Sequence, residues 1–321
     1  MLLLWVVALW AALTWALRSW MYRPFSLDDK VVVITGAGMG IGRRLAEKIY
    51  LTASNVTLVL LDINQDALEK TQRHLQELGK KSSTVRIYQC DVSDESAVER
   101  CIQQVIADVA PHPIAVLVNN AGIVSGKSIM ELTPSQVRRT FGVNLFAHFW
   151  LVKSVLPSMK QSDDAMIVSI ASVLGFTGGA RLSDYVASKS AVIGFHDCLR
   201  LELLHDQLRH IRTLLVCPLG IRTGMFDGLF DSDHGLFNLQ RIFAPMLTEN
   251  EVVESIHGAM LRGEHQVVSC HPGWLGTFLA ILAPITRVIP PVIRDQLSLA
   301  VGAVHGMDTF VGHGSKKKAT E

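Results

Sequence analysis

The sequence predicts an α/β fold with a doubly wound parallel sheet, and two observations carry this prediction. Residues 30–270 alternate short runs rich in β-branched side chains with longer stretches in which apolar residues recur three and four positions apart. The short runs are almost continuously apolar, which is typical of strands covered by helices on both faces. Because strands and helices alternate along the chain, the strands are expected to lie parallel. No repeat or long linker interrupts the pattern, so a single domain is expected over residues 28–270.

Six strands and five helices are expected in this domain. The strands are predicted over residues 31–35, 56–62, 85–91, 115–120, 166–170 and 213–218. The helices are predicted from their amphipathic period over residues 42–53, 64–79, 94–110, 134–160 and 184–209.

Residues 1–23 have the composition of a membrane anchor. An apolar run without charge is followed by Arg18, Trp20, Tyr22 and Arg23. The run is at the short end of what spans a bilayer, so it either crosses the membrane or lies within one leaflet. A secretory signal peptide is disfavoured, because no basic residues precede the run and no small-residue cleavage site follows it. The two arginines place the domain that follows on the cytosolic side.

A glycine-rich turn directly follows the first predicted strand and opens the first predicted helix. Its landmarks are Gly36, Gly40 and Gly42. Glycines at these positions let the backbone turn tightly and approach a pyrophosphate, whose charge meets the free amides at the helix N-terminus. The turn therefore predicts a dinucleotide site.

Asp62 closes the next strand, twenty positions beyond Gly42. A carboxylate at this place accepts hydrogen bonds from the adenosine ribose hydroxyls and repels a 2′-phosphate. Met39 and Ile63, which flank the same region, are not basic. NAD is therefore expected as the cofactor in preference to NADP.

Two later strands end in further polar residues. Asp91 either bonds the adenine ring or caps the helix that starts near residue 93 or 94. Asn119 begins the sequence N-N-A-G at 119–122 and either contacts the cofactor or braces the strands, while Gly122 leaves room for the cofactor.

A group of four residues predicts acid–base chemistry. Tyr185 and Lys189 lie four apart, on one face of a predicted helix. A phenol is a poor base at neutral pH, and a nearby ammonium stabilises its phenolate. Ser172, at the end of the fifth strand, is expected to hold the substrate oxygen against the phenol. Asn144 is expected to tie a water molecule to Lys189.

The C-terminal part, residues 271–313, carries a second apolar segment. Its stretch from Trp274 to Ile293 is interrupted by three prolines and by Arg287. These interruptions disfavour a membrane span, so the segment either lies on a membrane surface or packs as an ordinary core helix. Residues 314–321 form a polar, basic tail.

Charge and cysteine content exclude several other classes of function. Lys and Arg number 30 against 29 Asp and Glu, so no basic field points to nucleic acid. The cysteines show neither a C-x-x-C pair nor zinc-ligand spacing, and reduced thiols are expected, with Cys198 and Cys217 buried. His148, His196 and His205 show no metal-ligand pattern and are expected to be structural or exposed to solvent. No metal site is predicted.

Together these motifs resemble the short-chain dehydrogenase/reductase family over about residues 30–225. The resemblance implies a Rossmann-type fold and a catalytic tetrad, namely Asn144, Ser172, Tyr185 and Lys189. The family's Pro-Gly motif corresponds here to P-L-G-I-R-T at 218–223, with Leu219 in place of the glycine. The full set of residues expected to bind the cofactor is Gly36, Gly38, Met39, Gly40, Ile41, Gly42, Asp62, Asp91, Val92, Asn119, Ala121, Gly122, Tyr185, Lys189, Pro218, Ile221 and Thr223.

The segments at 141–150, 155–159 and 215–226, with the anchor, resemble membrane-bound retinol dehydrogenases and lipid-droplet 17-beta-hydroxysteroid dehydrogenases. This resemblance implies a lipophilic alcohol as substrate, membrane lipid as a partner, and a place at the endoplasmic reticulum membrane or the lipid droplet. It also implies a homodimer paired through the two longest helices. Residues 224–245 are rich in Phe, Leu and Met and are expected to form an apolar lid.

Two other functions fit the same scaffold. One is an NADPH-dependent carbonyl reductase that acts on a substrate such as retinal. The other is a lipid-droplet protein that keeps the fold without turnover, although a scaffold needs none of the four catalytic residues.

Overall fold

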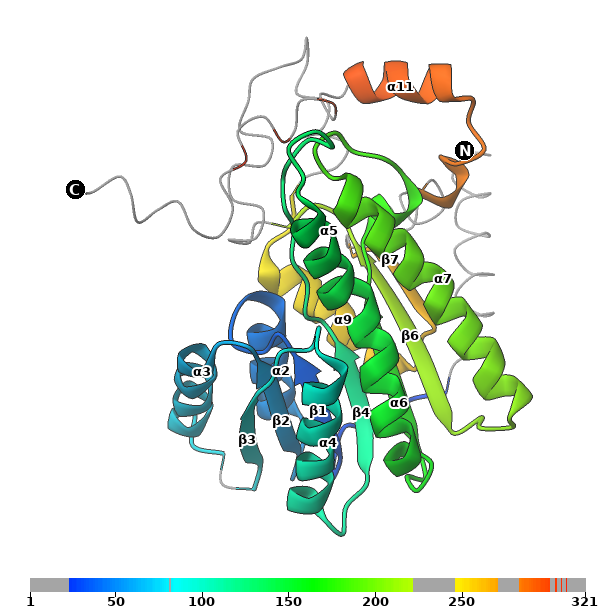
Figure 1. Cartoon of the computed structure of the whole chain (residues 1–321). Helices are drawn as coiled ribbons and strands as arrows, with labels where there is room; N and C mark the ends of the chain where they lie inside the picture. The colour runs from blue at the N-terminus through cyan, green and yellow to red at the C-terminus, as the bar shows by residue number, and fades with distance from the viewer. Residues whose placement is uncertain are drawn as a thin grey trace, which may run out of the picture.

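The strands form one twisted sheet with helices on both faces (Figure 1). The computed structural model describes residues 23–80, 82–221, 246–270 and 283–300, with residues 304, 307 and 310. Within this part, the strands are β1 (Val31–Thr35), β2 (Thr57–Asp62), β3 (Thr84–Gln89), β4 (Ile114–Asn119), β5 (Ala165–Ile170), β6 (Ile211–Pro218) and β7 (Gln266–Ser269). They are parallel and lie in the order β3-β2-β1-β4-β5-β6-β7, which confirms the predicted fold class.

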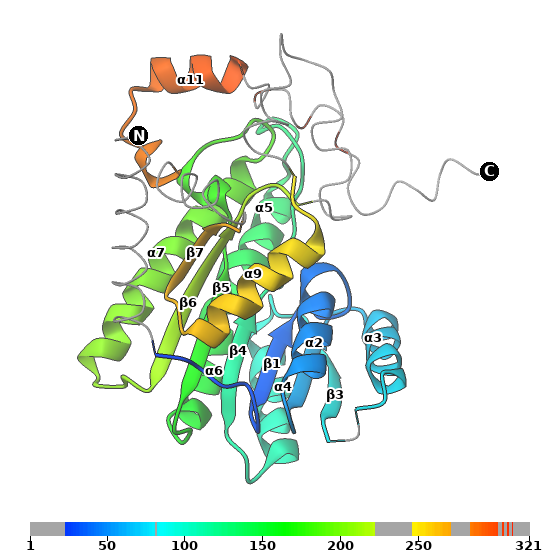
Figure 2. The ribbon, with the colours of Figure 1, turned by 180° about the vertical axis from the view of Figure 1, so that it is seen from behind.

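The helices other than α11 lie in two layers. The helices are α2 (Gly40–Thr52), α3 (Gln65–Glu77), α4 (Glu95–Val109), α5 (Pro134–Phe141), α6 (Ala147–Met159), α7 (Ser183–His205), α9 (Glu249–Arg262) and α11 (Pro291–Ala300). In Figure 1, α4, α6 and α7 cover the near face of the sheet, and Figure 2 shows α2 and α9 on the opposite face.

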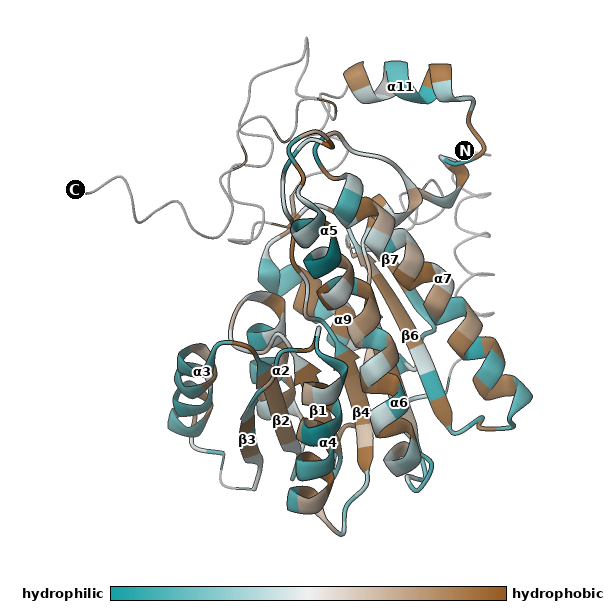
Figure 3. Cartoon of the chain, viewed as in Figure 1, coloured by the Kyte–Doolittle hydropathy of each residue, from teal (hydrophilic) through white to brown (hydrophobic). Residues whose placement is uncertain are grey.

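Alternate residues of each strand pack against the two helix layers. On β1, Val32 and Ile34 pack in the core cluster of α2 and α9, whereas Val31 and Val33 pack in the cluster of α4, α6 and α7. Because both faces are covered, the central strands are apolar throughout, as their colour in Figure 3 shows. The apolar runs that predicted the strands have this origin.

Two regular elements escaped the sequence prediction. Strand β7 has four residues, too few to show a period, and α9 lies after the last helix that was predicted. A capping box does mark the start of α9, where the Thr248 hydroxyl accepts from Glu251 N–H and the Glu251 carboxylate accepts from Thr248 N–H. The helix expected over residues 134–160 is α5 and α6 joined by a π-helical turn at Gly142–Phe146.

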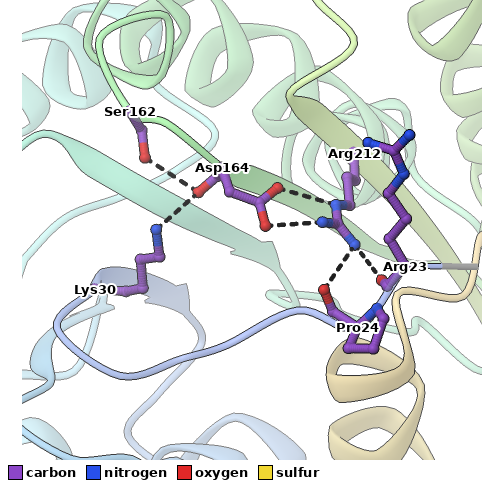
Figure 4. Close-up of polar contacts among 6 residues, drawn as sticks. All are labelled: Arg23, Pro24, Lys30, Ser162, Asp164 and Arg212. Carbon is purple, nitrogen blue, oxygen red and sulfur yellow. Dashed lines mark hydrogen bonds and ion pairs between the residues drawn. The ribbon is translucent and has the colours of Figure 1, made fainter.

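The chain enters the domain along the amino edge of the sheet, where Arg212 of β6 holds it (Figure 4). The Arg212 guanidinium pairs with the Asp164 carboxylate through two hydrogen bonds of 3.0 and 2.8 Å. It also donates to the backbone oxygens of Arg23 and Pro24 and lies 5.4 Å from the centroid of the Phe25 ring. The residues that follow the predicted anchor are therefore fixed to β6.

The segment around α11 lies apart from the sheet, beyond the loops that precede α5 and α7 (Figure 1). Val292 and Ile293 are 74% and 54% exposed, whereas Ala283 is buried, and the choice between a surface segment and a core helix stays a prediction. Hydrogen bonds from Thr286 and Arg287 to the backbone oxygen of Phe176 connect the preceding turn to the domain. In the part of the chain that the structure describes, no helix combines the length and apolar character needed to cross a bilayer.

Several predicted features fall outside the described residues. They are the anchor except Arg23, Thr223, the lid at 224–245, residues 271–282 and most of residues 301–313 of the C-terminal segment, and the tail at 314–321. The domain boundaries stay a prediction. All five cysteines are free; Cys217 is buried as expected, but Cys198 is exposed because it lies on the outer face of α7.

Candidate active site

The turn between β1 and α2 has the shape of a phosphate cradle. Gly36 and Gly40 have φ values of +64° and +55°, a conformation that side chains other than glycine rarely adopt. A Cβ at Gly42 would overlap the carbonyl oxygen of Gly36, so this helix–turn contact also requires glycine. Met39, the N-cap of α2, provides no side-chain acceptor for the first amides of the helix. These amides are available to an anion, as a dinucleotide pyrophosphate requires.

The Asp62 carboxylate lies beside this cradle. It accepts hydrogen bonds from the amides of Gly38 at 2.9 Å and Asn64 at 3.0 Å. These contacts fix the carboxylate at the carboxyl edge of β2, and the neighbouring Ile63 is 54% exposed and carries no charge. A carboxylate at this place can accept from a ribose diol, and neither Ile63 nor Met39 offers a cation to a 2′-phosphate.

The loop after β4 is braced by Thr35 and Asn120. The Thr35 hydroxyl accepts from the amides of Asn120 and Ala121 at 3.0 and 3.1 Å. The Asn120 amide donates to the backbone oxygens of Thr35 and Gly36 at 2.8 and 3.3 Å. The bracing considered for Asn119 is thus done by its neighbour. Asn119 is buried, and neither polar atom of its side chain has a hydrogen-bond partner in the described chain.

Asp91 does not cap α4. Its carboxylate accepts from the amide and the hydroxyl of Ser93, at 3.0 and 2.7 Å, and so closes the turn after β3. The cap is Asp94, which accepts from the amides of Ser96 and Ala97. Asp91 and the buried Val92 lie at the carboxyl edge of the sheet, and their contact with adenine stays a prediction.

Tyr185, Lys189 and Ser172 meet at the carboxyl edge of β5. Tyr185 and Lys189 are one turn apart on α7, with the Lys189 ammonium 5.9 Å from the centroid of the Tyr185 ring. The ammonium donates to the backbone oxygen of Ile170 at 2.7 Å. Ser172 follows β5 and hydrogen-bonds the Tyr185 side chain. Its hydroxyl also accepts from the Leu174 amide at 3.1 Å, which begins the 3-10 turn Val173–Phe176.

Asn144 joins this group through the π-helical turn. Its side-chain oxygen accepts from the Ile123 amide at 2.8 Å, and its amide donates to the Ile123 carbonyl and the Ser188 hydroxyl, both at 3.0 Å. A Cβ on Gly122 would lie 3.6 Å from both the Asn144 oxygen and the Lys189 nitrogen. The structure thus brings all four predicted catalytic residues together, with Gly122 between two of them.

The geometry is that of a nucleotide cradle and an acid–base group at one edge of a parallel sheet, and comparison with known proteins agrees with it. Residues 30–234 match the family model described as short chain dehydrogenase. The chain belongs to this family. It is 35% identical to human epidermal retinol dehydrogenase 2 over 289 residues, which cover 90% of the chain and 87% of the relative. It is 31% identical to human estradiol 17-beta-dehydrogenase 11 over 285 residues, covering 88% and 87%.

The fold comparison points the same way. A short-chain dehydrogenase/reductase from Burkholderia phymatum, solved in complex with NAD, superposes with a TM-score of 0.68 at 26% identity. The match covers 82% of this chain and 95% of that one. The protein is therefore an NAD(P)-dependent oxidoreductase of the short-chain dehydrogenase/reductase family that acts on CH–OH groups.

Burial controls the ionisation of the two central groups in this short-chain dehydrogenase. It raises the pKa of Tyr185 to about 12, against the hydrogen bond from Ser172, which lowers it. Burial also lowers the pKa of Lys189 to about 8. The pKa of the phenol is therefore above its ordinary value in the chain by itself, because the loss of hydration outweighs the Ser172 hydrogen bond. The effect of the Lys189 ammonium on the phenolate stays a prediction.

The remaining predicted residues lie near the same edge. Pro218 ends β6, and Ile221 is buried and forms a β-bridge with Leu247. Sequence reasoning missed Thr35, Asn120 and Ser188. The second asparagine of N-N-A-G was a usable signal for one of them; the other two needed the tertiary contacts. Among the described residues, no three His, Cys, Asp or Glu side chains are grouped as a metal site.

Proposed function

We propose that this enzyme oxidises a lipophilic alcohol with NAD, using Tyr185 as the acid–base group. The observation that carries the proposal is the convergence of Tyr185, Lys189, Ser172 and Asn144 at the sheet edge that holds the glycine cradle. Such convergence would allow a substrate hydroxyl, a proton acceptor and the dinucleotide to meet within one site. A chain kept only as a lipid-droplet scaffold has no need of it.

The proposed roles follow from position. The Ser172 hydroxyl orients the substrate oxygen, and the Tyr185 phenolate accepts its proton. Bound nicotinamide would accept the hydride from the carbinol carbon. Lys189 supplies the positive charge that favours the phenolate and is fixed by the Ile170 carbonyl. Asn144 fixes the loop after β4 through Ile123, which keeps Gly122 close to Lys189.

The preference for NAD is supported by the Asp62 carboxylate. Its two amide contacts hold it beside Gly38, where a 2′-phosphate would approach a negative charge. We also propose cofactor contacts for the predicted residues of the turn between β1 and α2, of the loops after β3 and β4, and of the segment at the end of β6.

Membrane attachment is proposed through residues 1–23 and through the exposed apolar side chains of α11 and of the turn before it. Val288 and Val292 are 80% and 74% exposed, which suits a bilayer interface better than water. The loop before α5 exposes Met130 at 91%. An endoplasmic reticulum or lipid-droplet surface, with the domain in the cytosol, would deliver retinoid, steroid or long-chain alcohols directly. A homodimer is proposed through α6 and α7, and Phe146 and Phe149, at and just after the N-cap of α6, are 44% and 41% exposed.

The test is NADH formation by the full chain in detergent, with retinol, a hydroxysteroid and a fatty alcohol. Tyr185→Phe should lower turnover at least about a hundredfold. Tyr88→Phe is the matched control, because Tyr88 hydrogen-bonds Asp108 on β3 and α4, away from the site. Full activity of Tyr185→Phe would remove the assignment. Faster turnover of the carbonyl with NADPH than of the alcohol with NAD would favour the reductase instead.

A further inference from the structure

A second group of buried polar side chains lies directly beneath the catalytic residues. His148 of α6, His196 of α7, Ser169 of β5 and Thr213 of β6 are each at most 2% exposed. Together they contain six side-chain nitrogen and oxygen atoms that have no hydrogen-bond partner within the described chain. Buried polar atoms are paired in the great majority of cases. Six unpaired ones among these side chains therefore require an explanation.

The four side chains occupy one layer. His148 follows Asn144 by four residues, one helical turn further from the catalytic edge, and His196 follows Lys189 by two turns on the buried face of α7. Thr213 pairs in register with Ile167, and Ser169 is two residues beyond Ile167 on the same face. That face packs against α6 and α7, because Ile167 shares its core cluster with Leu151 and Leu199.

Burial, with the charges nearby, keeps the two imidazoles neutral. Burial, then Lys189 and His196, lowers the pKa of His148. Burial, then Arg200 and His265, lowers the pKa of His196 to about 4. A neutral imidazole has one donor and one acceptor nitrogen, so it can accept a proton on one side and release one on the other.

The layer opens into a cavity at its far end. A cavity of about 490 Å³ is lined by His196, Thr213, Arg200 and Leu204, among others. Leu204 is 51% exposed and the Arg200 side chain 46% exposed, so this cavity reaches solvent. His196 and Thr213 thus belong both to the buried layer and to the cavity wall.

We propose that internal water molecules bridge these groups and form a proton path from Lys189, through His148 and His196, to the cavity between α7 and β6. Buried waters typically satisfy polar atoms that lack protein partners, and a polar layer is where they are retained. This inference rests on the proposed function: each alcohol oxidised releases one proton besides the hydride. The Tyr185 phenolate takes that proton from the substrate hydroxyl, and the Lys189 ammonium releases one proton into the path. The Lys189 amine then takes the proton from Tyr185, which restores both the phenolate and the ammonium, and no electrons move along the path.

The test compares His148→Phe, His196→Ala and His257→Phe in the full chain in detergent. His257 is the matched control, because it is a buried histidine on α9, across the sheet, bonded to Thr52. The two path variants should lower kcat about tenfold or more with KM nearly constant, and should increase the solvent isotope effect on kcat. The control should stay within about twofold of wild type, on the same general scale.

Chemical rescue separates a proton path from a packing role. Imidazole added to His196→Ala should restore turnover, and substituted azoles should do so in the order of their basicity. Pyrrole, which has the same shape and no basic nitrogen, should not restore it. Equal rescue by pyrrole, or path variants that behave like His257→Phe, would overturn the proposal.

Thr213→Val keeps side-chain volume and removes only the hydroxyl, so it tests the path where a histidine variant fails to fold. It should also raise the solvent isotope effect, and an unchanged isotope effect in this folded variant would count against the path. A wild-type chain that oxidises no alcohol would instead remove the proposed function, which keeps the two failures distinct. The ionisable groups facing the path, to be considered in its pH profile, are Lys189, Arg200, His265 and Asp197.

Discussion

Lys189→Met should make the protein more stable at pH 7 while abolishing its activity. Burial moves the pKa of Lys189 from 10.5 to about 8. At about 1.4 kcal/mol per pKa unit, holding the ammonium in the folded chain costs about 3 kcal/mol. Methionine removes this cost but leaves the buried Ile170 carbonyl without its donor at 2.7 Å. Loss of this hydrogen bond destabilises the folded chain by about 1–2 kcal/mol. The net gain at pH 7 is about 1–2 kcal/mol.

The pH dependence of this gain is its signature. Below pH 8 the folded and unfolded chains both carry the ammonium, so the full cost is present in the wild type. Between pH 8 and 10.5 the folded chain loses the proton first, and wild-type stability rises with pH. The advantage of the methionine variant should therefore shrink and then reverse.

The assay is guanidinium unfolding of the full chain in detergent at pH 7 and pH 10. Lys153→Met is the matched control, since its side chain is 70% exposed and should give a pH-independent difference. A difference between Lys189→Met and wild type that is the same at both pH values would refute the reasoning from burial.

Three further outcomes follow from the site and the edge of the sheet. Gly42→Ala should weaken NAD binding at least about tenfold in a fluorescence titration, because its Cβ would displace the Gly36 carbonyl. Unchanged affinity would mean that the turn accommodates the added methyl group without loss of binding. Asp62→Ala should raise the NADP to NAD ratio of kcat/KM by about tenfold or more through loss of a repulsive charge, and an unaltered ratio would argue against its role. Arg212→Ala should lower the free energy of unfolding by about 2–3 kcal/mol in chemical denaturation, because it leaves the Asp164 carboxylate unpaired and releases residues 23–25. A decrease under about 0.5 kcal/mol would show that these contacts contribute little to stability.

Prediction from the sequence succeeded where a feature is local. The six strands it gave are apolar because helices cover both sides of the sheet, so that pattern is visible without any tertiary knowledge. The cradle was visible because Gly36 and Gly42 are needed for backbone reasons, a positive φ and a close approach. Strand β7 was missed because four residues show no period.

Choices between neighbours could not be made from the sequence. Asn119 and Asn120 are adjacent asparagines, and only the register of β4 beside β1 decides that the second reaches Thr35 and Gly36. Asp91 and Asp94 are both plausible caps, and the start of α4 selects the second. In each pair the residue types are the same, so position in space is the sole difference.

The sequence by itself determined the fold class, the cradle and which four side chains are proposed as catalytic, because each depends on residue type and spacing along the chain. Only the tertiary structure decided how those side chains ionise. The pKa values of Tyr185 and Lys189 depend on how much water the packed layers exclude, and that burial is set by α6, α7 and the sheet together. The same packing brings His148 and His196, 48 residues apart, into one polar layer that no spacing rule connects.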